Sequence, residues 1–586
     1  MKWTTSRAVG LGALAVITVL AGCQPRSSAR LPALAAYPRL PASFRPVLAA
    51  AHARATEAGA GRDEVRKLGR LYEANGLYAE AKTCFDQVIS APDGGTARDH
   101  YSLADIAQNQ NDLPRARREL EDVARLDPGY LSARLALAEA CFKAGDEEAA
   151  TKAYTAATVL EPNQPQASLG LARLELQRGD EEAAIARLEE LMAAHPQFAA
   201  GAAFFAQILE RRGESDRAIA FAEISQQKPE PPPADPWAAE LLADCYDVQR
   251  LSITFEEDYK QGKMKEALPL LDRLAVLAPD SPVTRIFRGF SHAQALEHVA
   301  AVREYYDALD RGGDPEKICP YLVRSLLALG RGSEAAKLMA DYGPRFQQSQ
   351  PITKAWAEVA LQQGDEKLAR ALLEQILARE PYLADQNMSL ANLLWNAGEK
   401  DAAAKCLQRV AAARAEDFSA RALLGEYFLG RNRPREAVRP LEEAALHVPP
   451  KTPAQGNISA LLATAYYQVG NDEAGQEHLA AAADLFEKAT HLAPNGLDAW
   501  AADANACVQL GQFGRAAAAL EKLAALQPDN PTVFLSLGDV VYQDHRPEEA
   551  RRQWERARQL AAPDDQAIRG ALADRLAGRI TPDTFK

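Results

Sequence analysis

The chain has 586 residues, which is too long for one ordinary hydrophobic core and typical of several domains or of one extended array. Apolar residues make up 47% of it and charged residues 25%, so most of the chain is expected to fold, and its abundant Ala, Leu, Glu and Arg favour helix. The net charge of −13 disfavours general nucleic-acid binding, which needs basic surfaces against phosphate, although a local basic site stays open.

The first residues are expected to form an export signal. Lys2 and Arg7 accompany an apolar run at residues 8–20, which is too short to span a bilayer comfortably. The run ends in Leu-Ala-Gly-Cys at Cys23, which resembles the lipobox of bacterial lipoproteins. This resemblance implies a signal peptide at residues 1–22, cleavage before a lipid-modified Cys23 and a durable membrane anchor. The alternatives are an ordinary signal with an accidental Cys or an internal apolar helix.

The residues after the lipobox indicate the membrane in which the protein is expected to be anchored. Gln24 stands where an Asp would be linked to inner-membrane retention, so the resemblance implies the outer membrane, on its periplasmic face. Residues 23–46 contain five prolines and few large apolar groups, which predicts a tether. No other apolar run approaches 18 residues, so no second membrane crossing is expected.

From residue 62 the sequence repeats itself. Gly69 and Ala81 stand twelve apart in the stretch LGRLYEANGLYAEAKTCF, and the same spacing of small residues recurs down the chain. Fourteen units can be set, starting at Arg62, Ala97, Leu131, Pro165, Ala199, Val248, Thr284, Glu316, Gln350, Ala384, Phe418, Gly456, Leu497 and Pro531. The eighth residue is Gly, Ala or Ser in twelve units, and the twentieth is Ala in twelve.

Small residues at this spacing predict pairs of closely crossing helices. Two helices approach closely only where their side chains are small, so the eighth and twentieth residues mark a contact between the two helices of each unit. Turn residues such as Gly145-Asp146 and Gly364-Asp365 stand between the helices. A helix of this length is marginal alone, so neighbouring pairs must stack to bury their faces.

This pattern resembles the tetratricopeptide repeat (TPR), a 34-residue helix-turn-helix, over roughly residues 62–562. The resemblance implies an all-α solenoid, a right-handed superhelix of 13 to 14 repeats. Arg303 and the unit from Glu316 depart from the pattern, and the unit from Gly456 carries about seven extra residues.

A proline-rich segment at residues 229–236 is expected to divide the repeats. It separates a first array at 47–228 from a second at 237–562, unless it is a loop insertion bridged by a rigid interface. Residues 237–259 are expected to form one longer helix that opens the second array. Residues 563–586 are expected to hold a capping helix at 566–576 and a tail.

The chemistry of catalysis is largely missing from the sequence. The histidines are scattered, no nucleophile, phosphate-loop or zinc motif is present, and the cysteines beyond Cys23 form no CxxC pair. We therefore expect no enzymatic activity, no cofactor and no metal. The six further cysteines are expected to be core thiols, with disulfides as the alternative in an exported protein.

Binding is the remaining route to function. In TPR arrays the first helices line a groove, so the resemblance implies that the ninth residue of each unit faces it, among them Arg70, Asp105, Glu139 and Arg173. Aromatic residues stand three positions further on, at Phe142, Tyr259, Trp395, Tyr467 and Tyr542. Such a polar groove with aromatics suits an extended peptide or a glycan. The alternative is a solvated face with aromatics packed between repeats.

These features predict a lipid-anchored TPR scaffold that holds other envelope proteins or peptides. It looks like the lipoproteins that serve outer-membrane assembly, secretion or polysaccharide export. The alternative is a glycan-binding or activator subunit of a cell-wall or polysaccharide enzyme.

Overall fold

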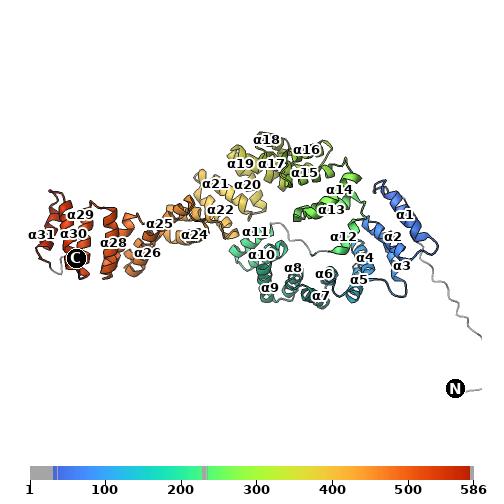
Figure 1. Ribbon diagram of the computed structural model, residues 1–586, viewed down its shortest axis with the longest axis horizontal. Helices are drawn as coiled ribbons and strands as arrows, with labels where there is room; N and C mark the ends of the chain where they lie inside the picture. The colour runs from blue at the N-terminus through green and yellow to red at the C-terminus, as the bar shows by residue number, and fades with distance from the viewer. Residues whose placement is uncertain (1–30, 36, 227–232, 234, 581–586) are drawn as a thin grey trace, which may run out of the picture. The chain divides into compact units, whose positions relative to one another are not determined.

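The computed structural model describes residues 31–35, 37–226, 233 and 235–580. In these ranges it contains 31 α-helices and one short 3-10 helix, and no strand (Figure 1). The expected signal peptide at 1–22 and the lipidation site Cys23 lie outside the described residues. Within the described ranges, no helix has both the length and the apolar character that a membrane crossing requires.

Fourteen helix pairs account for all but three of the α-helices, and their first helices begin within three residues of the expected unit starts. The pairs of the first half are α2 (Arg62–Ala74) with α3 (Tyr78–Ile89), α4 (Ala97–Asn109) with α5 (Leu113–Leu126), α6 (Leu131–Lys143) with α7 (Glu147–Leu160), α8 (Pro165–Gln177) with α9 (Glu181–Ala194), α10 (Ala199–Arg211) with α11 (Ser215–Ser225), α13 (Val248–Gln261) with α14 (Met264–Leu277), and α15 (Pro282–Gln294) with α16 (His298–Asp310).

The pairs of the second half are α17 (Pro315–Ala328) with α18 (Gly332–Tyr342), α19 (Gln350–Gln363) with α20 (Glu366–Arg379), α21 (Ala384–Asn396) with α22 (Lys400–Ala413), α23 (Phe418–Gly430) with α24 (Pro434–His447), α25 (Pro453–Gly475) with α26 (Leu479–Leu492), α27 (Leu497–Gln509) with α28 (Phe513–Leu526), and α29 (Pro531–Gln543) with α30 (Pro547–Leu560). The expected all-helical repeat fold is thus confirmed.

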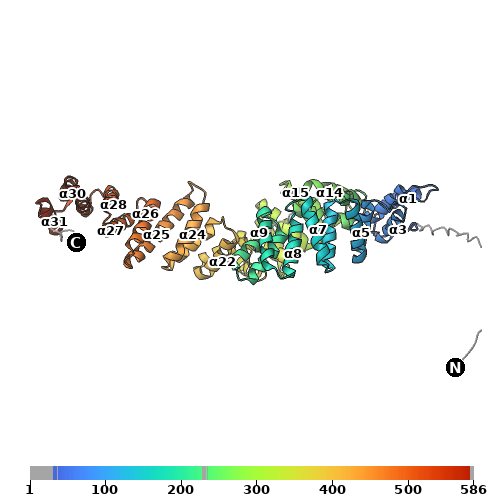
Figure 2. The same ribbon diagram turned by 90° about the horizontal axis from the view of Figure 1, so that it is seen from below.

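The helices fall into two compact units. Unit 1 takes the described parts of Met1–Leu174, Pro232–Glu257 and Lys265–Pro279, and unit 2 takes those of Glu175–Pro231, Asp258–Met264 and Asp280–Lys586. In unit 2 the pairs from α15 to α30 pack against one another in chain order, as Figures 1 and 2 show. Division of the repeats into two arrays at the proline-rich segment remains a prediction.

The Gly-Asp turns between paired helices act through backbone geometry and capping. Gly145 and Gly364 both have left-handed φ angles, of 74°, which cost little for a residue without a Cβ atom. The next residue then caps the second helix, since the Asp146 carboxylate accepts from the Ala149 amide at 3.1 Å and Asp365 accepts from Leu368 at 3.1 Å. These dipeptides therefore end one helix and start the next.

In pairs such as α2 with α3, α6 with α7 and α21 with α22, the two helices meet at the predicted small residues. Ala81, Ala150 and Ala403 are each 0% exposed. The eighth residue of a unit faces the large residue sixteen positions later: a Cβ atom at Gly69 would lie 3.1 Å from a ring carbon of Phe85. At Gly425 it would lie 2.3 Å from Cγ of Leu441, a clash that the missing side chain avoids.

The same contact corrects the register of two units. In α15 the residue that meets its partner is Gly289, whose Cβ would lie 2.3 Å from Cε1 of Tyr305, and Ala301 is the buried partner twelve residues on. The expectation that Arg303 breaks the pattern is therefore wrong, because the unit starts two residues earlier and Arg303 is exposed. In the longer unit, Gly470 faces Phe486 and Ala482 is buried.

The extra seven residues of that unit lengthen its first helix, since α25 spans 23 residues against 13 in each of its neighbours α23 and α27. Three α-helices lie outside the pairs: α1 (Phe44–Thr56), α12 (Pro236–Leu242) and α31 (Gln566–Leu576). The predicted helix at 566–576 is confirmed as α31. The single helix expected at 237–259 is wrong, because the chain leaves the helix between α12 and α13, where Asp247 caps the new helix by accepting from the Gln249 amide at 2.9 Å.

The six cysteines beyond Cys23 are all buried and free, which confirms that they are core thiols. They are Cys84, Cys141, Cys245, Cys319, Cys406 and Cys507. Burial raises the pKa of the Cys84 thiol to about 12, so this side chain behaves as a small apolar group.

Replacing Gly289 with Ala should lower the free energy of unfolding by about 1–3 kcal/mol, because the new methyl group meets the buried ring of Tyr305. Denaturant unfolding followed by circular dichroism measures the change. The control is Gly456→Ala in α25, where a Cβ meets nothing within 4 Å. That substitution should stabilise by about 0.5–1 kcal/mol through helix propensity, and equal losses at both positions would contradict the close-contact explanation.

Candidate functional site

In unit 1 a segment of the chain lies across the first helices of the early repeats. This docked segment, residues 235–246, contains α12 and the turn that follows it, and α12 packs beside α2 (Figure 1). The residues that hold it, named here the receiving face, are Asn75, Arg98, Tyr101 and Tyr130. Two of these stand at the second and fifth positions of the unit from Ala97, so the docked segment lies on first-helix residues, the kind of surface predicted to bind peptides.

The carboxylate of Asp235 is gripped by two tyrosines. Tyr101 donates its hydroxyl to Oδ2 of Asp235 at 2.6 Å, and Tyr130 donates to Oδ1. Burial, together with the Asp235 charge, raises the pKa of both phenols, which keeps them protonated as donors. Asp235 also caps α12 by accepting from the Ala238 amide at 3.0 Å.

The indole of Trp237 completes an aromatic cluster on the receiving face. It stacks on Tyr130 with ring centroids 3.8 Å apart and an interplanar angle of 16°. Its centroid lies 5.4 Å from that of Tyr101, edge to face, and the two tyrosines contact each other at the same distance. Such ring pairs add about 0.5–1.5 kcal/mol each beyond their buried area.

Ionic and backbone contacts continue along the docked segment. Arg98 pairs with Glu240 at 2.5 Å. Further on, the Asn75 side chain donates to the Asp244 carbonyl at 3.0 Å and accepts from the Tyr246 amide at 2.6 Å. The segment is therefore held through its side chains at its start, and at its end through its backbone and through the Tyr246 ring, which contacts Phe44 with centroids 5.4 Å apart.

Two predicted groove residues, Arg70 and Asp105, lie near a buried carboxyl that the sequence analysis missed. Glu73 is 3% exposed, and burial, reinforced by the nearby charge of Asp105, raises its pKa to about 8. Burial also raises the pKa of Asp105 and lowers that of Arg70. Among the described residues, Oε2 of Glu73, Oδ2 of Asp105 and Nε of Arg70 are buried without a hydrogen-bond partner. Buried polar atoms without a hydrogen-bond partner lower the stability of the fold.

The other predicted groove residues of unit 1 have structural contacts. Glu139 accepts from the Tyr154 hydroxyl at 3.0 Å and pairs with Lys143 at 3.3 Å. Phe142 packs, half-buried, against the core of its repeats. Arg173 is half-buried on α8.

The four aromatic candidates of unit 2 stand on four different helices, and each has a neighbour of its own. Tyr259 stacks on Phe290 with centroids 4.6 Å apart, and Lys400 Nζ lies 4.6 Å above the Trp395 ring. Tyr467 contacts Phe486 and Tyr542 contacts Trp554, at 6.0 and 5.6 Å. Whether any of them binds a ligand stays a prediction.

Unit 2 also contains a hollow of about 550 Å³ along α27 and α29, near the C-terminal end of the repeats. Its lining includes Asn505 and Asp539, two ninth-position residues, with Asp498, Ser536 and Gln543. Asp539 is fixed by Arg575 of α31 at 2.5 Å, and burial raises its pKa. The lining also includes apolar residues such as Val508 and Leu520, so the hollow presents a mixed polar and apolar surface.

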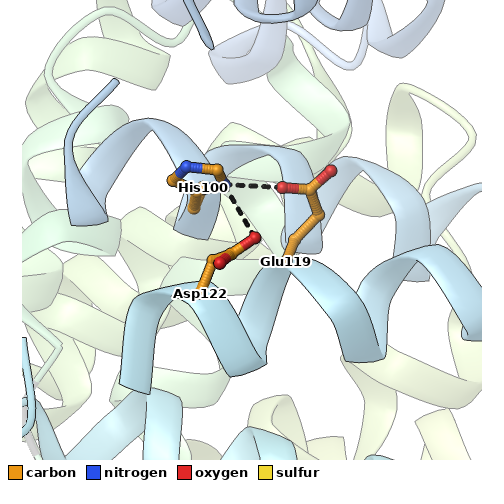
Figure 3. Close-up of side chains that lie close together, drawn as sticks. All are labelled: His100, Glu119 and Asp122. Atoms are coloured by element: carbon orange, nitrogen blue, oxygen red, sulfur yellow. Dashed lines mark hydrogen bonds and ion pairs between the residues drawn. The ribbon is translucent and has the colours of Figure 1, made fainter. Parts of the chain in front are cut away.

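One group of side chains in the described part of the chain could hold a cation: His100 of α4 with Glu119 and Asp122 of α5 (Figure 3). Nδ1 of His100 lies 2.7 Å from Oε2 of Glu119, and Nε2 lies 2.9 Å from the Gly94 carbonyl. Both ring nitrogens thus face acceptors, which suits a doubly protonated imidazolium. The hydrogen bond to Glu119 raises the pKa of His100, and Arg115 also donates to Glu119 at 3.2 Å. An ion pair that ties α4 to α5 accounts for this geometry.

The sequence analysis did not select the residues that form the receiving face. Tyr101 and Tyr130 could not be selected from the sequence because their partner, Asp235, lies more than 100 residues away in the chain. The Asp-Pro-Trp stretch after the proline-rich segment was visible as a composition break, and its polar and aromatic side chains were the available signal.

Comparison with known proteins identifies the repeats. Models described as tetratricopeptide repeat match residues 67–92, 101–168 and 388–455, and one described as TPR repeat matches 504–544. The chain therefore contains tetratricopeptide repeats, and no curated protein sequence matches it.

Solved structures with similar folds include the APC/C hetero-tetramer Cut9-Hcn1, at 15% identity over 83% of this chain and 96% of that one, with a TM-score of 0.27. The P58(IPK) TPR domain has 17% identity over 58% of this chain and 99% of that one, with a TM-score of 0.22. YrrB, described as a TPR protein with an unusual peptide-binding site, has 16% identity over 34% and 96%, with a TM-score of 0.24.

The ion pair of His100 predicts a pH-dependent contribution to stability. Because the folded pKa is raised, the contribution is complete below about pH 6.5 and is lost as the pH rises through the folded pKa. The loss of unfolding free energy in His100→Gln should therefore be largest near pH 5–6 and shrink at higher pH. In an NMR titration Glu119→Gln should lower the His100 pKa, and an unchanged titration would contradict the pairing.

Proposed function

We propose that this repeat protein is a lipid-anchored scaffold that holds partner proteins in the bacterial cell envelope, on the periplasmic face of the outer membrane. The observation that carries the binding role is the receiving face, because the first helices of unit 1 hold a short helical segment with acidic and aromatic residues through side-chain contacts. Tetratricopeptide repeats support protein–protein interaction generally. The anchor and the compartment rest on the lipobox-like sequence that ends at Cys23.

The proposal assigns no reaction to the chain. The buried thiols are inert in their raised-pKa state, and the buried carboxyls of Glu73 and Asp105 lie beneath a face that already binds chain. The proposed partners are proteins of outer-membrane assembly, secretion or polysaccharide export, processes in which several proteins must be held close together. The hollow along α27 and α29 offers a second surface for them.

The anchor is tested by Cys23→Ala in cells that export the protein. The full chain should be found in the membrane fraction and take up a clickable palmitate analogue, whereas the variant should be released and unlabelled. Cys84→Ala is the matched control, since Cys84 is a buried core thiol. Membrane association of the Cys23 variant, or the absence of lipid label on the full chain, would contradict the proposal.

The scaffold role is tested with a photo-crosslinking amino acid in living cells. Placed at Asp498, which lines the hollow and is exposed, it should give discrete adducts with envelope proteins. Placed at Arg303, whose side chain is 78% exposed on α16, it should give few. Equal adduct patterns at the two positions would show that the hollow selects no partner.

A further inference from the structure

The docked segment has the features of a bound peptide more than those of a packed repeat. Over residues 235–240 the polar and aromatic contacts are made by a charged side chain, an indole and a second acid, at positions 235, 237 and 240, whereas Cys245 and Tyr246 at the end of the segment pack in the core of unit 1. Leu241 is the buried residue of α12, and Ala238, Ala239 and Glu240 are exposed. A seven-residue helix with so little buried surface is held mainly by these recognition contacts.

The contacts of the receiving face define which residue types it recognises. A carboxylate takes hydrogen bonds from two phenols, a proline follows it at the start of α12, and an aromatic ring stacks flat on Tyr130. An acid three residues beyond the ring then meets the Arg98 guanidinium. The recognised pattern is Asp-Pro-Trp followed, after two further residues, by an acid.

The same first helices also carry carboxylate oxygens that accept no hydrogen bond within the described part of the chain. Glu73 is almost fully buried, yet its Oε2 atom has no hydrogen-bond partner among the described residues, and Oδ2 of Asp105 is in the same condition. With the docked segment in place, these buried atoms therefore lack hydrogen bonds from any described residue. A ligand that reached these atoms as well would gain contacts that the internal segment does not make.

We propose that the receiving face is a peptide-binding site and that residues 235–240 are an internal ligand of it. The partner is a protein that presents an exposed acid-proline-aromatic segment with a following acid, and its binding displaces the internal copy. This inference deepens the proposed scaffold function and rests on it, since it names the chemistry of one partner. Displacement would couple partner binding to release of α12.

The test uses the purified full chain, in detergent where it carries lipid, and a fluorescent peptide of residues 232–241. In the wild type the internal segment competes at an effective concentration of order millimolar, so the free peptide should bind weakly. The double substitution Asp235→Ala and Trp237→Ala empties the face, and the peptide should bind this variant about tenfold or more tightly. Adding Tyr130→Ala should abolish binding, and a peptide with Ala in place of its Asp and Trp is the control.

Three outcomes overturn the inference: no peptide binding to the emptied variant, equal binding to wild type and variant, or unchanged binding after Tyr130→Ala. If circular dichroism shows that the double variant is unfolded, Asp235→Asn serves instead, because it keeps the side-chain shape and removes the charge. The peptide should still bind the Asp235→Asn variant more tightly than it binds the wild type, but by a smaller factor than in the double variant. The measurement needs neither the anchor nor the envelope, so it stands apart from failure of the Cys23 test.

Discussion

Most of the repeats share one steric contact, between a small residue on the first helix and a large residue sixteen positions later on the second. At Gly69 and Phe85, or Gly425 and Leu441, there is no room for a methyl group without movement. Alanines twelve positions on, such as Ala81 and Ala437, let the second helix approach as closely. Because each pair is too short to be stable alone, this contact has to be repeated and stacked before the chain folds.

In such an architecture the second helices pack between repeats, and side chains of the first helices remain available for binding. In unit 1 those side chains hold the chain's own segment through Asp235 and Trp237. In unit 2 a hollow lies along the first helices of the last two repeats. The buried thiols and the His100 ion pair stabilise the packing of the helices. The proposed function is therefore binding, with specificity set by tyrosine, arginine and carboxylate side chains at particular positions.

Local spacing predicted the fold well, because small residues and Gly-Asp turns act on their own repeat. It failed where units were counted from an assumed start: Arg303 was taken for a contact position although Gly289 and Ala301 make the contact, and extra residues in α25 shifted another unit. The helix expected at 237–259 failed because the turn before Asp247 breaks it. The receiving face could not be predicted, since its contacts join residues over 100 positions apart and no periodicity encodes such a pairing.

The claim that a small residue and its large partner form one steric unit is tested most directly by a double-mutant cycle at Gly425 and Leu441. Leu441→Ala alone should cost about 2–5 kcal/mol, because the side chain is 0% exposed. In the Gly425→Ala background it should cost at least about 1 kcal/mol less, since the added methyl group occupies vacated space. Costs that add within about 0.5 kcal/mol would mean that the two residues do not share a contact, and the account of the repeat would fail.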